Sequence, residues 1–251
     1  TGDRTKTNFV DFGVIGYSEI SYATLNGNVF SLPAGGSVTV HDYSYAISEK
    51  LSCTLNVGTN FSAIYLTLNN RVITGMDSKP FNDIIPANSI VIGIMQFGNI
   101  YIRGVNIKPL ISNQENKILQ FCGFGEILAV NNIEYTLSDD NSRVNSIVFN
   151  SGAIYTDDGF HYEVSESYPY VSTINDNEMK YNACIVGFDA LNKKIVFIPF
   201  DTIFLDNNRI YIIGFCNSSV CYINGMGFAH PKNISDTNGN ANIGATPIRW
   251  D

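Results

Sequence analysis

Four tyrosines stand in two close pairs whose residue type suits the binding of a sugar. Tyr43 and Tyr45 form one pair, and Tyr168 and Tyr170 form the other. Aromatic rings stack on the apolar faces of sugars, while a few polar groups fix the orientation of the ligand. We therefore predict these four side chains as ligand-binding residues. Tyrosines that alternate along strands also serve as half-buried packing residues, and the sequence leaves both interpretations open.

The sequence contains no pattern that marks a catalytic nucleophile. The G-x-S-x-G turn of serine esterases is absent. Asp158 and His161 have the spacing of the Asp-x-x-His that closes SGNH-type hydrolases, but the serine block of those enzymes is missing. We predict no catalytic residue. The alternative is a carbohydrate-active hydrolase, an esterase or a glycosidase, whose acids come from distant strands. Carboxylates that gather in one region are Asp139, Asp140, Asp157, Asp158, Glu163 and Glu166.

No metal ion or cofactor is predicted either. Residues 236–240 carry oxygen ligands at alternate positions, as calcium loops do, but Ala241 replaces the required glycine. The five cysteines lack the CxxC spacing of zinc sites. Cys216 and Cys221 could pair across a hairpin, and buried free thiols in a chain that folds in a reducing cytosol are the other interpretation.

The charge balance argues against nucleic acid as a partner, and the lengths of the apolar runs argue against a membrane. With 23 acidic and 15 basic residues the net charge is −8, and the basic residues are scattered, so we predict no nucleic-acid surface. No apolar run approaches the length of about 18 residues that spans a bilayer, so we predict no membrane insertion. The chain begins at Thr1, and we expect a processed form or a piece of a longer polypeptide.

Two parts of the chain, about 120 residues apart, share one pattern. Residues 88–94 are echoed by 208–214, and residues 100–104 by 221–225. In the same comparison His41 stands opposite His161, and the first tyrosine pair falls opposite the second. We therefore predict one β-rich unit that occurs twice.

The local patterns favour strands over helices. Short stretches rich in Ile, Val, Tyr, Phe and Thr recur between clusters of Asn, Gly, Asp and Ser. Asn-rich turns at 69–70 and 217–219 predict hairpins, which favour consecutive antiparallel pairing. Residues 49–55 and 178–182 are the two candidates for a short helix.

Sheets without helices to cover them bury one face against another sheet. We predict an all-β chain with two tandem, mutually similar antiparallel domains, each a sandwich, jelly roll or barrel. The first domain is predicted over residues 8–110 and the second over 119–228. Residues 229–251, which end in the only tryptophan, are predicted as an extended C-terminal arm.

Residues 1–9, the run at 85–92 and the Asn-rich, strand-rich body resemble accessory β-domains of phage and prophage tail fibre or receptor-binding proteins. The resemblance implies a part of a trimeric fibre or spike, a domain that binds host surface glycans, or a neighbour of an SGNH-type esterase domain. We therefore expect a non-catalytic structural or receptor-binding module of a virus particle. Its expected partners are a host surface glycan or protein and other virion subunits, in a homo-oligomer with a trimer favoured. The expected location is the virion or the extracellular space, after assembly in the host cytoplasm.

Overall fold

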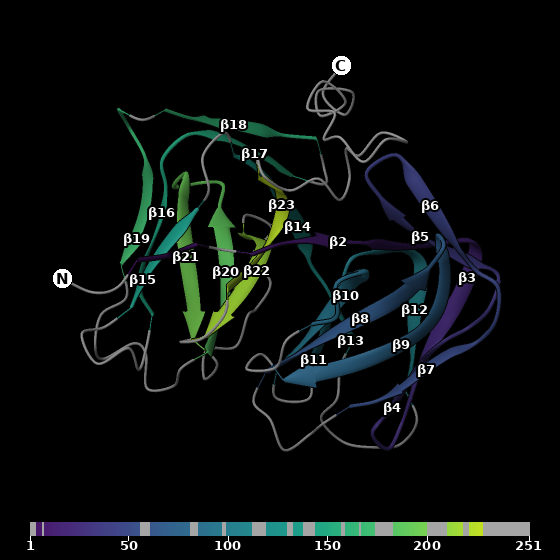
Figure 1. The fold of residues 1–251 in the computed structure, drawn as a ribbon. Coiled ribbons are helices and arrows are strands. Elements are labelled where there is room, and N and C mark those ends of the chain that lie inside the picture. Colours follow the sequence, from purple (N-terminus) through teal and green to yellow (C-terminus); the bar gives the residue numbers. More distant parts are fainter. Residues whose placement is uncertain are drawn as a thin grey trace. The chain divides into compact units, whose positions relative to one another are not determined.

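The chain is all-β, as the sequence predicts. Every regular element among the described residues is a strand, because short β-branched and aromatic runs between turn residues suit a pleated, half-buried surface (Figure 1). Residues 229–251 lie outside the described part, so the predicted arm stays a prediction. The computed structural model describes residues 4–6, 8–55, 61–80, 85–96, 99–111, 119–129, 133–137, 144–156, 159–165, 167–173, 183–199, 210–217 and 221–227.

The chain divides into two compact units. Asp11–Cys122 forms the N-terminal unit, and Thr1–Val10 together with Gly123–Asp251 forms the C-terminal unit. The sequence suggested a boundary between residues 110 and 119, whereas this division falls after Cys122. The sequence also gave no sign that the C-terminal unit contains residues from the beginning of the chain.

Two sheets of the N-terminal unit share one core. One sheet has the order β6-β5-β3-β4-β7 with β12 beside β3, and the other joins β9, β8, β10, β11, β13 and the end of β2. The core takes Phe30 and Leu32 from the first sheet and Ile64, Leu66 and Ile90 from the second. Burial of each such side chain contributes about 1.5–3 kcal/mol. The strands are β2 (Asn8–Phe12), β3 (Val14–Asn26), β4 (Val29–Leu32), β5 (Gly36–Val40), β6 (Tyr43–Ile47), β7 (Leu51–Thr54), β8 (Phe61–Asn69), β9 (Val72–Pro80), β10 (Ser89–Gln96), β11 (Asn99–Ile102), β12 (Gly104–Ile111) and β13 (Leu119–Phe121).

The C-terminal unit is also built from sheets that share a core. One sheet has the order β1-β15-β16-β19, and a second contains β14, β22, β20 and β21. Ile147 and Phe149 of the first sheet belong to the same buried cluster as Val186, Phe188 and Ile195 of the second. The strands are β1 (Arg4–Lys6), β14 (Gly123–Ala129), β15 (Glu134–Leu137), β16 (Val144–Phe149), β17 (Gly152–Thr156), β18 (His161–Val164), β19 (Tyr170–Thr173), β20 (Ala183–Asp189), β21 (Lys194–Pro199), β22 (Ile210–Asn217) and β23 (Cys221–Gly227).

Strand pairs of the N-terminal unit recur in the C-terminal unit with the same relative direction. A Cβ atom added to Gly93 would meet the carbonyl oxygen of Tyr101, and one added to Gly214 would meet that of Tyr222. The same close approach of a neighbouring backbone therefore favours glycine at both positions, one in each unit. Superposition of the complete units stays a prediction. The corresponding pairs are Gly93↔Ile102 and Gly214↔Ile223, Gly104↔Ile15 and Gly225↔Ile127, and Val38↔Tyr45 and Ile154↔Tyr162.

The pairing departs from the sequence expectation in one respect. Hairpin neighbours such as β8 and β9 or β22 and β23 are antiparallel, as predicted. Parallel pairs also occur, between β2 and β10, β3 and β12, and β14 and β22. The sequence did not predict them because turn residues report only on strands that follow each other in the chain.

The first helix candidate is wrong. Residues 51–54 form β7, whose side chains alternate between buried and exposed. This strand pairs with β4, so Leu51 and Cys53 enter the core on one face. A period of two is the strand period, and pairing with β4 outweighs the local helix propensity. The second candidate, 178–182, lies outside the described residues.

Candidate functional site

Two hairpin tips of the N-terminal unit carry the first candidate site. Strands β5 and β6 are joined through His41 and Asp42, and β8 and β9 through Asn70 and Arg71. The φ angles of Asn70 and Arg71 are 48° and 63°, and that of His41 is 53°. Two consecutive residues with positive φ are typical of a type I′ turn, in which Asn-Gly is the favoured pair. Arg71 therefore occupies a position that favours glycine, at a cost of about 1–2 kcal/mol.

The predicted pair Tyr43 and Tyr45 lies on one face of β6, an edge strand of its sheet. Their ring centroids are 4.6 Å apart with an interplanar angle of 57°. The Cζ atom of Arg71 lies 5.7 Å from the centroid of the Tyr43 ring. The Tyr43 side chain is 44% exposed, whereas Tyr45 is half-buried. The three side chains form what we call the Tyr–Arg cluster, and its cation–π contact contributes about 0.5–1 kcal/mol.

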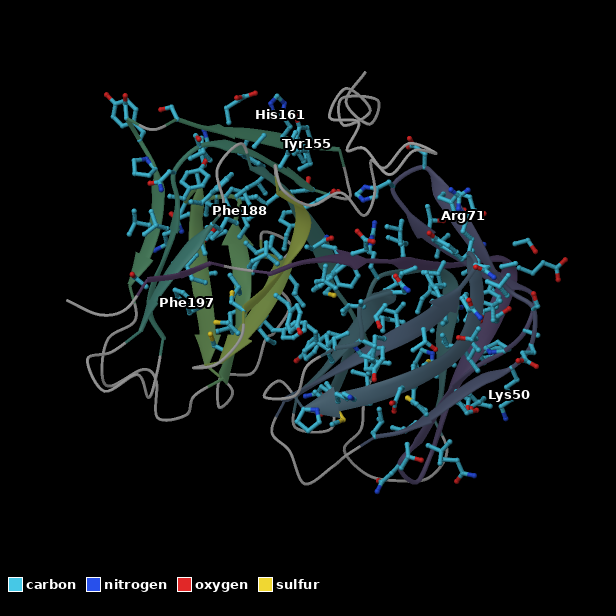
Figure 2. All side chains as sticks on the ribbon, viewed as in Figure 1. Lys50, Arg71, Tyr155, His161, Phe188 and Phe197 are labelled. Atoms are coloured by element: carbon cyan, nitrogen blue, oxygen red, sulfur yellow. The ribbon has the colours of Figure 1, made fainter. Side chains whose placement is uncertain are left out.

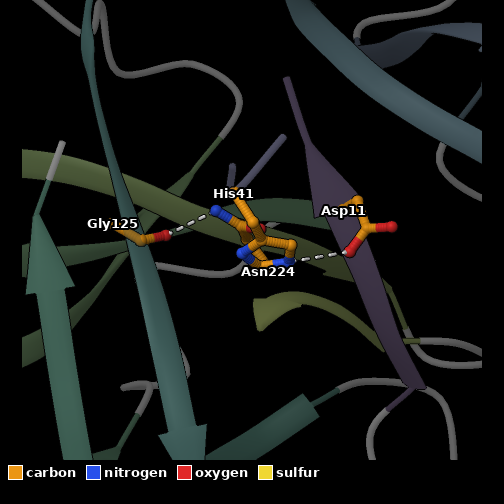
Figure 3. A network of polar contacts seen from close by, with 4 residues as sticks. All are labelled: Asp11, His41, Gly125 and Asn224. Atoms are coloured by element: carbon orange, nitrogen blue, oxygen red, sulfur yellow. Dashed lines mark hydrogen bonds and ion pairs between the residues drawn. The ribbon is translucent and has the colours of Figure 1, made fainter. Parts of the chain in front are cut away.

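A histidine and a carboxylate lie near Tyr45. His41 Nε2 is 3.6 Å from Oδ1 of the buried Asp11. Figure 3 draws this contact and also a hydrogen bond of the C-terminal unit, in which Asn224 Nδ2 donates to the carbonyl of Gly125. Burial raises the pKa of Tyr45, the negative charge of Asp11 raises it further, and the cation of Arg71 opposes both. Tyr45 therefore remains a neutral hydrogen-bonding phenol at neutral pH.

The second predicted pair is split between two environments. Tyr168 is 81% exposed. The ring centroid of Tyr170 lies 6.4 Å from that of Phe149 and 5.6 Å from that of Phe188, so Tyr170 covers the edge of the core. Burial, and then the neighbouring Tyr162, raises the pKa of Tyr170. The described contacts thus give Tyr170 a packing role and leave Tyr168 as an accessible ring.

An aromatic group that the sequence did not suggest lies on β17 and β18 of the C-terminal unit. The rings of Tyr155 and His161 are stacked, with centroids 5.0 Å apart and an interplanar angle of 9°. His161 Nε2 lies 2.8 Å from Oε1 of the exposed Glu163. Figure 2 shows Tyr155 and His161 beside each other. Their meeting follows from register, since Tyr155 pairs directly with His161 and no spacing in the sequence reveals that.

The strand register also corrects the predicted correspondence between the histidines. His161 stands opposite Tyr155 within a strand pair, and the equivalent position of the N-terminal unit is Ser44, opposite Thr39. His41 instead lies in a turn with positive φ. The two histidines therefore do not share a position, and the counterpart of Tyr45 is Tyr162.

The described residues give little information on the other sites considered from the sequence. Within the described part of the chain no three His, Cys, Asp or Glu side chains form a group suited to a metal ion. Among those residues no helix is long and apolar enough to cross a membrane. The carboxylates Asp139, Asp140, Asp157, Asp158 and Glu166, and the loop at 236–240, lie outside the described residues.

Comparison with known proteins found no relative of this chain. No protein-family model, no curated protein and no solved structure matches this chain.

Proposed function

We propose that this chain is a non-catalytic receptor-binding or structural module of a phage particle, and that its Tyr–Arg cluster binds a host surface glycan. The observation that supports this most directly is the geometry of Tyr43, Tyr45 and Arg71 at two adjacent hairpin tips. An exposed ring supplies a stacking face, and a half-buried phenol beside it supplies a fixed hydroxyl group.

Arg71 narrows the class of sugar. Among the described residues no carboxylate lies within salt-bridge distance of its guanidinium group. Its strained backbone is consistent with a functional role, because residues in sparsely populated regions concentrate at binding sites. A guanidinium group binds carboxylates through paired hydrogen bonds. We therefore propose a glycan that carries a carboxylate, such as one containing a uronic acid.

The test is binding of full-length protein to an array of acidic and neutral oligosaccharides. Tyr43→Ala removes the stacking face and should reduce binding to every retained glycan by about 2- to 12-fold, since a stacking contact on one aromatic ring contributes about 0.5–1.5 kcal/mol. Arg71→Ala should reduce binding only to the acidic sugars. Tyr22→Ala is the matched control, because Tyr22 is 48% exposed on another strand.

Two results would count against this proposal. One is an array without any retained sugar, and the other is equal binding by the Tyr43→Ala and Tyr22→Ala variants. The mass of the assembly in solution tests the proposed homo-oligomer separately, and a monomer at working concentration would count against a trimeric fibre part.

A carbohydrate-active hydrolase is the second candidate, and the contact between His161 and Glu163 is the observation that favours it. A carboxylate that orients an imidazole is a common part of hydrolytic sites. Release of acetate or reducing sugar from a panel of esterase and glycosidase substrates tests it. Turnover that is lost in His161→Gln and kept in His41→Gln would favour the hydrolase over the binding module.

A further inference from the structure

Three thiols meet inside the core of the C-terminal unit. Cys184, Cys216 and Cys221 stand on the adjacent strands β20, β22 and β23, and all three are fully buried. The register places Cys184 directly opposite Cys216, and Cys216 directly opposite Cys221. Cys216 is therefore the central thiol of a row of three.

The geometry suits a disulfide bond. Sγ of Cys184 lies 3.3 Å from Sγ of Cys216. Residues directly opposite each other on antiparallel strands have Cα atoms about 4.5–5.5 Å apart, which falls within the range that disulfide bonds require. The two sulfur atoms must approach each other by about 1.3 Å to reach the length of a disulfide bond.

We propose that these cysteines form a dithiol–disulfide centre, in which oxidation joins Cys184 to Cys216 and leaves Cys221 as a third thiol that can exchange with the bond. This inference does not depend on the proposed glycan binding. The oxidant is a low-molecular-weight disulfide such as glutathione disulfide.

The reaction balances as two thiol–disulfide exchanges. The Cys216 thiolate attacks the small disulfide, forms a mixed disulfide and releases one small thiolate. The Cys184 thiol then gives up its proton and attacks Sγ of Cys216, and the second small thiolate leaves and takes up a proton. The protein loses two protons and two electrons, and the small disulfide is reduced to two thiols.

Cys216 is the thiol best suited to the first attack. Hydrogen bonds from Cys184 and Cys221 lower the pKa of Cys216, while burial raises the pKa values of Cys184 and Cys221. The thiolate is the reactive form of cysteine. Its position also permits access, because Cys216 is the penultimate residue of β22 and Cys221 the first of β23, and strand ends open more readily than strand centres.

The experiment oxidises the folded full-length chain with glutathione disulfide, blocks the remaining thiols with N-ethylmaleimide in urea, and maps the cross-linked peptides. We expect three blocked thiols and one Cys184–Cys216 peptide, where the reduced chain gives five blocked thiols. The same oxidation in urea should favour Cys216–Cys221 by about tenfold, because the shorter loop closes more easily. Peptide mapping of the wild-type chain is decisive even if a variant fails to fold.

Variants locate the reactive thiol. Cys216→Ala should abolish disulfide formation in the folded chain, whereas Cys221→Ala should retain the Cys184–Cys216 bond. Cys53→Ala and Cys122→Ala are the matched controls, since both thiols are buried in the N-terminal unit and should leave the disulfide unchanged. A folded chain that keeps five thiols, or that joins Cys216 to Cys221 instead, would overturn the assignment.

Discussion

Gly214 offers the sharpest test of the strand pairing, because alanine there would press against a neighbouring strand. A Cβ atom would meet the carbonyl oxygen of Tyr222, and it would lie 2.8 Å from Cδ1 of Ile223. Extra methyl groups in well-packed positions cost about 1–3 kcal/mol. Since the first obstacle is a backbone atom of a paired strand, we expect Gly214→Ala to lose about 3 kcal/mol, roughly 100-fold in the folding equilibrium.

Two other glycines calibrate this value. Gly93 is the counterpart of Gly214, and its Cβ atom would lie 2.9 Å from Tyr101 O, so Gly93→Ala should lose less, about 1–2 kcal/mol. Gly75 is the control, since its nearest obstacle is Thr67 Oγ1 at 3.4 Å. Gly75→Ala should be neutral or should gain about 0.5 kcal/mol, because alanine restricts the unfolded chain.

The assay is urea unfolding followed by circular dichroism, with the midpoint and slope fitted separately for each transition. Equal losses of unfolding free energy relative to the wild-type chain for Gly214→Ala and Gly75→Ala would refute the close approach of β22 and β23. A loss in Gly75→Ala larger than that in Gly214→Ala would refute the ranking of the contacts.

Three further predictions concern single side chains. Phe188→Ala should lose about 3–5 kcal/mol in urea unfolding, since this ring is fully buried, whereas Tyr168→Ala should change stability by less than about 0.5 kcal/mol. Asp189→Ala should lose about 1–3 kcal/mol, because Asp189 Oδ1 accepts hydrogen bonds from the backbone N–H groups of Leu191 and Asn192; Asp189→Asn should retain part of this stability in the same assay. Burial raises the pKa of Tyr17 from 10.0 to about 12, so the neutral phenol stabilises the folded state fully below pH 10 and this contribution is lost as the pH rises through 12. Unfolding measured from pH 9 to 12 should show a smaller decline for Tyr17→Phe, and an unchanged decline would contradict the assignment.

The sequence predicted the features that depend on neighbouring residues. Alternation of polar and apolar residues predicted the all-β class, and the Asn69–Asn70 turn predicted the β8–β9 hairpin. It could not reveal contacts set by register between distant strands. Arg71 reaches Tyr43 across two separate hairpins, and Tyr155 meets His161 only because β17 and β18 pair in one register. A shift by one residue would turn either side chain to the opposite face, and the sequence alone carries no signal that selects between the two.

The same limit explains the row of thiols. The distances in sequence suggested only Cys216 with Cys221, because these two flank one predicted turn. Cys184 is 32 residues from Cys216, and their contact follows from the pairing of β20 with β22.

The division of the chain makes the C-terminal unit a discontinuous domain, interrupted between Val10 and Gly123 by an insertion that is itself a folded unit. If the insertion were unfolded, the pairing of β2 with β23 would have to close a loop that includes residues 11–122, which is 112 residues. The entropy of that closure corresponds to about 4 kcal/mol.

Folding of the insertion removes most of this cost. Asp11 pairs with β10, Cys122 donates its backbone N–H to Ile102 of β11, and β10 pairs with β11, so the two ends of the insertion are held near each other. The folded insertion then acts as a short linker between the two parts of the C-terminal unit. It raises the effective concentration of the first residues of β2 for their pairing with β23. The order of assembly is thereby biased toward the insertion first, and damage to it would weaken a neighbour whose own side chains are intact.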